Sequence, residues 1–337
     1  MNFFDLELRD GEKFNQVCFP EMMKQHPFAN MRNHLIGMAL FFSCLVVGDA
    51  FALTLTPVKV APDVYAFIGD TGMRTADNEG MNANTGFIVT GEGVVVIDSG
   101  PTWKVAKEIH LAIKTVTRQP VKIVVNTGGQ DHRWLGNGYF KSIGAEIVAA
   151  RPVLADMQAR GEMQLDGLRQ ALGKKVAGTQ PVYPDRFFDQ SEILRLGGQE
   201  IQLLYFHGGH TPGDSVVWLP KKNVLFSGDL VYVDRLLGVL PLSSATGWLA
   251  SFEMMEKLKP KTIIPGHGQV CDLARARRDS GDYLRLLITH MQQAVDKGIT
   301  LQEAIDSLDQ SAFSHLINFD LLKGGNASRV YLEVEGQ

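Results

Sequence analysis

Residues Val121–Phe140 read VKIVVNTGGQDHRWLGNGYF. The first five are mostly β-branched and apolar, which predicts a short buried strand. The following Asn and Gly-Gly predict a loop, because glycine adopts backbone conformations that strand residues cannot. Asp131 and His132 come next. A carboxylate and an imidazole just past the carboxyl end of a buried strand stand where open α/β sheets hold their ligands, so the stretch predicts a ligand or metal site.

The same pattern recurs further along the chain. Three more short apolar strands each end in a glycine-containing turn that carries His210, Asp229 or His267. A single histidine at a strand end is more often a hydrogen-bonded turn residue than a ligand. Recurrence at four strand ends is more than turn chemistry alone would give, and it predicts that these side chains converge on one site.

The elements around the opening stretch predict a β-α-β unit. An apolar strand at 94–97 ends in Asp98, and residues 102–115 carry helical spacing before the strand at 121 begins. A right-handed crossover would place Asp98 and Asp131 near the same edge of the sheet. We expect Asp98 to orient the ligand loop through hydrogen bonds.

The rest of the chain alternates strands and helices, and its carboxyl end is mainly helical. The long loop 71–85 has no periodicity and predicts a lid or substrate-facing segment. Pro181–Asp189 is expected to be irregular. Further strands are expected at 53–70 (a hairpin), 146–149, 193–196, 201–206, 216–219, 223–226 and 262–264, and helices at 155–172, 246–258, 279–297 and 300–308.

Composition restricts the class of protein. The chain has 337 residues, 45% of them hydrophobic, which is enough for a sizeable core. The formal net charge is −4, so nothing predicts nucleic acid or an anionic membrane as a partner.

Residues 1–52 are predicted to be a leader. Within it, Met31–Ala52 has a basic start, a thirteen-residue apolar run and an Ala-Phe-Ala cleavage pattern ending at Ala52, which is typical of a secretory signal. The alternative is a membrane-anchoring helix, but a span needs about 20 apolar residues. The polar residues before Met31 indicate that translation starts at Met22, Met23 or Met31. No membrane association is expected after cleavage.

The cysteines agree with this interpretation. Cys18 and Cys44 fall in the leader, so Cys271 remains alone in the mature chain. An exported protein without a possible intramolecular disulfide must be held together by its core or by a metal.

Over residues 55–270 the chain resembles the metallo-β-lactamase fold superfamily. The successive motifs are Asp98, the Asp131-His132 pair, His210 in GHTPG, Asp229 in SGD and His267 in PGHG. The resemblance implies an α/β fold, an αββα four-layer sandwich with mixed sheets and added C-terminal helices. Residues 53–337 would be a single domain, with 271–337 a helical extension packed on it.

One motif departs from that family. Its His-x-His-x-Asp-His run corresponds here to residues 127–132, TGGQDH, so threonine and glycine stand where two histidines are expected. The resemblance implies metal ligation by Asp131, His132, His267, Asp229 and His210. Zinc takes about four ligands. Asp131, His132 and His267 with Asp229 meet that number, whereas Thr127, Gly129 and His210 do not, so we expect one zinc rather than two.

With one zinc the chemistry remains possible. Asp131 or Asp229 would orient a metal-activated water, and His210 would stabilise the oxyanion or protonate the leaving group. His207 is a less favoured substitute ligand. Arg133, Trp134 and Arg235 lie on predicted loops near the groove and could contact the substrate.

Flanking sequences such as NANTGFIV and GWLASFE resemble the exported SoxH-like group, which includes the quinoprotein relay system metallohydrolases. This implies a periplasmic, glyoxalase II-like hydrolase of a small-molecule ester or thioester, with periplasmic redox-pathway partners. Two alternatives stay open: a catalytically degenerate binding or accessory protein on the same scaffold, and a β-lactam hydrolase.

Overall fold

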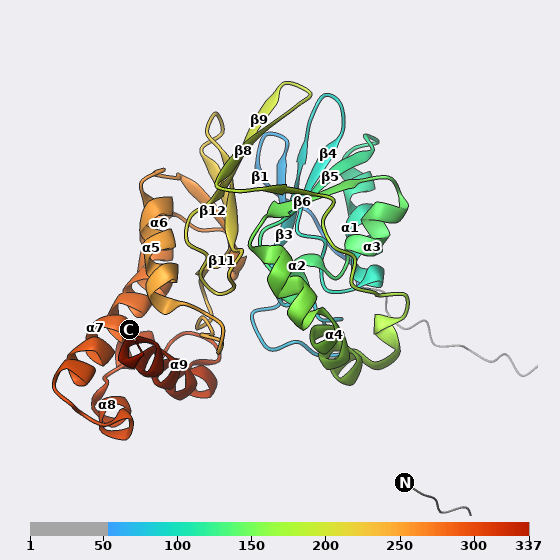
Figure 1. Ribbon diagram of the computed structural model, residues 1–337. Coiled ribbons are helices and arrows are strands. Elements are labelled where there is room, and N and C mark those ends of the chain that lie inside the picture. The colour runs from blue at the N-terminus through green and yellow to red at the C-terminus, as the bar shows by residue number, and fades with distance from the viewer. Residues whose placement is uncertain (1–52, 337) are drawn as a thin grey trace, which may run out of the picture. The chain divides into compact units, whose positions relative to one another are not determined.

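The structure, a computed structural model, describes residues 53–336. Two β-sheets face each other and helices cover the outer face of each, which gives four layers (Figure 1). The expected αββα sandwich with mixed sheets and C-terminal helices is confirmed. The predicted leader, with Cys18, Cys44 and the cleavage site near Ala52, lies outside the described residues.

The first sheet has seven strands whose spatial order follows the sequence order. Its first four strands pair antiparallel and the remaining pairs are parallel. The strands are β1 (Val58–Ala61), β2 (Val64–Phe67), β3 (Thr85–Val89), β4 (Val94–Ile97), β5 (Val121–Asn126), β6 (Glu146–Ala150) and β7 (Arg186–Phe188).

The second sheet has five strands, and their spatial order also follows the sequence order. Its pairs are antiparallel except the last two strands, which run parallel. The strands are β8 (Ser191–Leu196), β9 (Gln199–Tyr205), β10 (Ser215–Leu219), β11 (Val224–Tyr232) and β12 (Thr262–His267).

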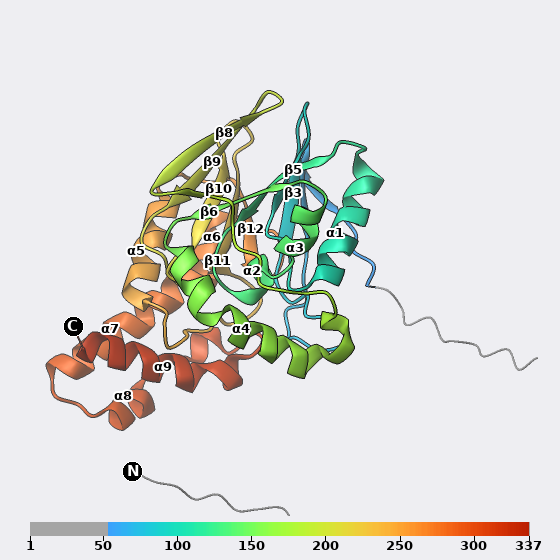
Figure 2. The ribbon, with the colours of Figure 1, turned by 45° about the vertical axis from the view of Figure 1, so that its right-hand side comes forward.

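Helices lie outside both sheets and below them (Figure 2). They are α1 (Trp103–Val116), α2 (Asp131–Trp134), α3 (Asn137–Ser142), α4 (Val153–Leu172), α5 (Ala245–Glu256), α6 (Leu273–Ala276), α7 (Asp282–Asp296), α8 (Leu301–Ser307) and α9 (Phe319–Glu335). Short 3₁₀ segments occupy Gly173–Val176 and Ser311–Phe313, and a π-helical turn, Arg277–Gly281, leads into α7.

Burial explains why the sheets form. All four residues of β4, sequence VVVI, are buried, and all nine residues of β11 are buried, as expected for strands covered on both faces. One apolar cluster fills the space between the sheets, a second lies under α1, and a third joins the five-stranded sheet to α5, α7 and α9. The sheet ends are thereby held rigidly, and side chains at those ends have fixed positions.

Most expected elements agree with the structure. Strand β4 has the predicted bounds, α1 is shifted by one residue, and the β4-α1-β5 unit is parallel. The capping box of Thr300 and Glu303 at α8 is present. Pro181–Asp189, expected to be irregular, contains β7, so that prediction was wrong. Its short Arg-Phe-Phe run pairs at the sheet edge next to β6, where tertiary pairing outweighs weak local signals.

Residues 68–84 connect β2 to β3 without a helix or strand, as expected for the long loop. Within residues 53–336, no helix has the length and apolar character needed to cross a membrane.

Candidate metal centre

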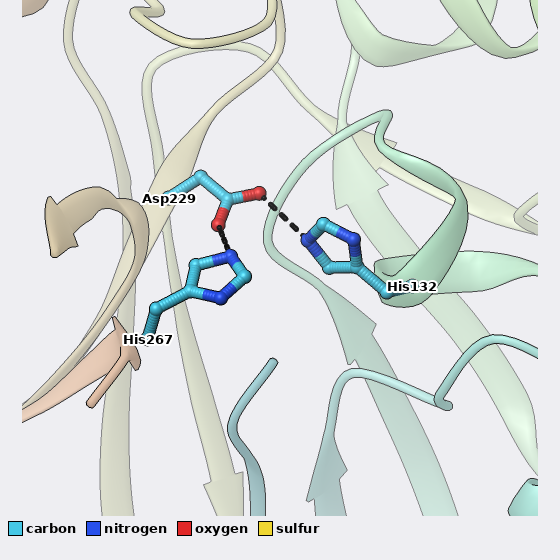
Figure 3. A group of neighbouring side chains, drawn as sticks. All are labelled: His132, Asp229 and His267. Atoms are coloured by element: carbon cyan, nitrogen blue, oxygen red, sulfur yellow. Dashed lines mark hydrogen bonds and ion pairs between the residues drawn. The ribbon is translucent and has the colours of Figure 1, made fainter. Parts of the chain in front are cut away.

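Three metal-capable side chains meet at one end of the two sheets. His132 lies in the short helix α2, directly after β5, whereas Asp229 belongs to β11 and His267 ends β12. One ligand atom from each lies within 4.8 Å of the other two, and all three residues are buried (Figure 3). The first sheet therefore supplies one donor and the second sheet supplies two.

The Asp229 carboxylate lies between the two imidazoles. Its Oδ2 is 3.2 Å from His132 Nε2, and its Oδ1 is 3.2 Å from His267 Nε2. The two rings meet edge to face at 81°, with centroids 5.2 Å apart. Both rings therefore aim a nitrogen at the same carboxylate (Figure 3).

The His267 ring is held in its orientation by Asn82 and Tyr232. Its Nδ1 lies 2.6 Å from the carbonyl oxygen of Asn82, so Nδ1 carries the hydrogen and donates it. Its ring stacks on Tyr232, with centroids 4.4 Å apart. The remaining nitrogen, Nε2, is buried and has no hydrogen-bond partner. Burial lowers the pKa of His267 well below its ordinary value, although Asp229 opposes the shift, so this Nε2 presents a lone pair.

Arg133, also in α2, holds Asp229 through both carboxylate oxygens. It is 1% exposed. Its Nη2 donates to Asp229 Oδ1 at 2.6 Å and its Nε donates to Oδ2 at 3.1 Å. Burial alone would raise the pKa of Asp229, but Arg133 and His132 hold that pKa well below its ordinary value. Asp229 is therefore ionised.

Every N–H of Arg133 has an acceptor. Besides Asp229, Nη1 donates to Asp98 Oδ2 at 3.0 Å and to the Asn84 carbonyl at 2.7 Å, and Nη2 donates to the Gly266 carbonyl at 3.1 Å. The five donors of a guanidinium are thus all used. Arg133 links β3, β4, β11 and β12 around the site.

These residues fit a bound cation. Each Asp229 oxygen accepts one N–H from Arg133 and faces one imidazole Nε2 across the space between them, and a hydrogen bond joins Oδ2 to His132. His267 presents an unpaired Nε2 to that same space. Three protein donors that leave a position open are typical of catalytic zinc. A cation between them would offset the repulsion between the Nε2 lone pair of His267 and the negatively charged carboxylate of Asp229.

Asp131 does not join this group, although the sequence predicted that it would. Its carboxylate pairs with both terminal nitrogens of Arg74, one of them at 2.8 Å. Its Oδ1 also accepts the His132 backbone N–H at 2.7 Å. Burial would raise the pKa of Asp131, but Arg74 holds it well below the ordinary range. Asp131 therefore ties the loop before β3 to α2 and orients His132, whose Nδ1 lies 3.2 Å from Oδ1.

His210 lies near the group but outside it. Its Nδ1 is 2.9 Å from the Gly238 carbonyl, and its ring lies edge-on to Trp248 at 5.4 Å. Burial lowers its pKa to about 4, despite the opposing charge of Asp229. The neutral ring donates from Nδ1, so Nε2 can accept but not give a proton. The neighbouring His207 is exposed.

The loop that lacks the two expected histidines has no room for them. At the second of the two positions, a Cβ on Gly129 would lie 2.1 Å from Asp156 Oδ2. The Thr127 hydroxyl donates to Asp98 at 2.8 Å, so it is already used. This side of the site is filled by carboxylates and the loop backbone rather than by ligands.

Asp98 takes the role expected from its position at the end of β4. It accepts the Thr127 backbone N–H at 2.7 Å as well as the Thr127 hydroxyl and Arg133. Burial raises its pKa, with Arg133 opposing the shift. It fixes the ligand loop to the sheet and has no place in the group of donors.

Two functional positions had no clear signal in the sequence. The sequence placed Arg133 on a loop as a possible substrate contact, but it lies in α2, is 1% exposed, and its partners are 35 to 133 residues away in the chain. Asn84, just before β3 of the first sheet, binds the end of β12 in the second sheet. Its side-chain amide donates to the carbonyls of Pro265 and Gly268 at 2.9 and 2.7 Å. The second sheet reaches the first through these bonds. Trp134, another residue expected near the substrate, is fully buried in the protein interior, and its indole N–H donates to Gln164 Oε1 at 3.0 Å.

Comparison with known proteins agrees with this geometry. The family model described as Metallo-beta-lactamase superfamily matches residues 78–267, which include all three donors. A metallo-beta-lactamase type 2 of Elizabethkingia meningoseptica is 27% identical over 219 residues, 62% of this chain and 77% of that protein. The acyl-coenzyme A thioesterase MBLAC2 of Gallus gallus is 25% identical over 108 residues, 31% of this chain and 39% of its own length.

A solved structure supports the fold. The metallo-beta-lactamase from Pontibacter korlensis superposes with a TM-score of 0.56 at 24% identity, and the alignment covers 69% of this chain and 99% of that one. The family match spans more than half of the chain and contains the strand ends that carry the donors. The chain therefore belongs to the metallo-beta-lactamase superfamily.

Proposed function

We propose that the protein is a zinc-dependent hydrolase that binds one zinc ion per chain and cleaves an ester or thioester. The observation that carries this proposal is the convergence of His132, Asp229 and His267, with the Nε2 of His267 buried and unpaired. A single ion is favoured because no second group of three His, Cys, Asp or Glu side chains converges in this way within residues 53–336.

A zinc ion, when bound, would polarise the substrate carbonyl and bring the pKa of water to about 7. The protein's own residues supply orientation. Arg133 holds the Asp229 carboxylate in place through both oxygens, and the carbonyl of Asn82 holds the His267 ring. Neutral His210 can accept a proton at Nε2 but is not a proton donor at neutral pH.

The substrate class is supported by the relative from Gallus gallus, whose name describes a thioesterase. The sequence segments that resemble the SoxH-like group also favour a thioester substrate. The name of the relative from Elizabethkingia meningoseptica favours a second candidate, a β-lactam hydrolase. A panel of thioesters, simple esters and β-lactams tests both, and the largest kcat/KM identifies the class.

A metal-poor binding protein is the other candidate. It is favoured by the pairing of Asp229 with Arg133, which satisfies the carboxylate without a metal. Elemental analysis of the purified protein separates the two. About one zinc per chain, lost in His132→Ala and His267→Ala and kept in the exposed control His207→Ala, supports the hydrolase. No zinc after incubation with zinc and dialysis refutes it.

We also propose that the protein is exported to the periplasm and has redox-pathway partners there. The proposal of export depends on the sequence of residues 1–52. Amino-terminal sequencing of the mature protein should find a chain that begins just after Ala52. A chain that keeps residues 31–52 would contradict cleavage.

A further inference from the structure

The loop between β2 and β3 reaches two of the three candidate donors. Near its end, the carbonyl of Asn82 accepts the hydrogen of His267 Nδ1 at 2.6 Å. Nearer its start, both terminal nitrogens of Arg74 pair with the Asp131 carboxylate. Asp131 in turn faces His132, because its Oδ1 lies 3.2 Å from His132 Nδ1. A single loop without helix or strand therefore holds one histidine directly and the other through a carboxylate.

The two nitrogens of the His132 ring face different carboxylates. Nε2 lies 3.2 Å from Asp229 and Nδ1 lies 3.2 Å from Asp131. Nδ1 is buried and has no hydrogen-bond partner in the described part of the chain. An ion bound at Nε2 would leave the ring hydrogen on Nδ1, with Asp131 as its acceptor. A carboxylate in that place fixes the orientation of a metal-binding histidine and makes it a better ligand.

Asp131 keeps this place because Arg74 holds it. Their side chains are 4% and 24% exposed, and within residues 53–336 Arg74 is the one arginine or lysine that forms an ion pair with Asp131. Removing one partner of a buried ion pair leaves a charge that is costly to keep buried. Without Arg74 the Asp131 carboxylate should turn away, and His132 should lose its support.

Other bonds hold the loop on both sides of Arg74. Arg235, which follows β11 and is 7% exposed, donates from Nη1 to the Gly72 carbonyl at 3.1 Å. Glu79 accepts from Lys104 of α1 at 2.7 Å. Loss of Arg74 should therefore free Asp131 without detaching the whole loop.

We propose that Arg74 is a positioning residue that makes release of a bound ion depend on opening of the loop between β2 and β3. It acts on His132 through Asp131, while Asn82 of the same loop acts on His267. An ion leaves more easily when a ring that binds it can turn, and the loop restrains both rings. This inference rests on the ion of the proposed hydrolase and concerns how long that ion stays bound.

The test measures how fast a chelator removes zinc from the purified protein. Arg74→Met and Arg74→Lys are compared with the wild type and with the control Arg186→Met. Arg186 lies in β7, at the edge of the first sheet, and pairs with Glu146 and Glu192, so its loss also breaks ion pairs of an arginine. Amide exchange of residues 70–81 is followed by mass spectrometry with and without zinc.

Arg74→Met should release zinc about 10- to 100-fold faster than the wild type, in line with the usual loss of metal affinity when the support of a ligand is removed. Arg74→Lys should release it at an intermediate rate, because lysine offers the charge without the fork. Arg186→Met should match the wild type. Because coupling is reciprocal, zinc should slow exchange of residues 70–81 in the wild type and much less in Arg74→Met.

Equal release rates in the wild type and Arg74→Met would overturn the proposal. Slower release from Arg74→Met would also overturn it, because Arg74 would then compete with the ion for Asp131 as a direct ligand. If release depends on Arg74 but no ester or thioester is cleaved, the positioning role stands and the hydrolase proposal fails. Hydrolysis with unchanged release gives the reverse result, and a wild type that takes up no zinc overturns both. If Arg74→Met does not fold, the rate for Arg74→Lys decides.

Discussion

Replacing Arg133 by methionine should destabilise the protein severely. Methionine is also long and unbranched, but it lacks the charge and all five N–H donors. The change leaves the carboxylates of Asp98 and Asp229 buried without their cation. Breaking a buried ion pair by removing one partner costs about 3–5 kcal/mol. For a chain of this size that corresponds to a fall in Tm of about 6–20 °C.

The assay is thermal and urea unfolding followed by circular dichroism, with Arg195→Gln as the exposed-arginine control. A second variant, Arg133→Met combined with Asp229→Asn, should lose less than the sum of the two single changes, because the asparagine removes the stranded charge. Zinc should raise the Tm of Arg133→Met more than that of the wild type, since the cation meets an unpaired carboxylate.

A loss below about 1 kcal/mol in Arg133→Met would refute the assigned role of this arginine. Strict additivity in the double variant would refute the pairing with Asp229 even if the single variant were unstable.

Three further predictions concern other residues. His210, whose pKa burial lowers from the ordinary 6.5 to about 4, contributes stability that is present above pH 6.5 and lost as the pH falls through 4. His210→Gln should therefore lose about 3 kcal/mol less than the wild type between pH 7 and pH 3.5, as measured by urea unfolding; equal losses would contradict the burial of a neutral ring. Cys271, whose thiol pKa burial raises to about 12, should react with iodoacetamide far more slowly at pH 8 than a free cysteine, and about tenfold faster per pH unit up to pH 11; rapid labelling at pH 8 would disprove it. Arg74→Met should speed amide exchange in residues 70–81, because the pair with Asp131 ties this loop to α2; mass spectrometry against Arg195→Gln measures it, and unchanged exchange would show that the loop needs no tether.

The strand-end pattern made much of the fold predictable. Apolar runs such as VVVI at β4 carry a strong signal, and the turn residues behind them mark where side chains leave the sheet. His132, Asp229 and His267 could be grouped on that basis, because parallel strands bring their carboxyl ends to one edge. The absence of histidines at 127 and 129 was visible in the sequence itself.

The partners of those residues were not predictable. Asp131 had the chemistry of a ligand, but Arg74, 57 residues earlier in the chain, takes its carboxylate. Arg133 stands beside His132 in the sequence, yet its acceptors lie in or next to four different strands. Which of two neighbouring polar groups reaches a site depends on side-chain direction and on distant segments, and no local pattern encodes either.

The three donors come from both sheets, and the last of them, His267, lies 200 residues after Phe67, the end of the β1-β2 hairpin. A growing polypeptide therefore has no complete ion-binding group until β12 has been made and the second sheet has docked on the first. Ion capture should follow folding rather than guide it, and the ion would be acquired in the compartment where folding finishes.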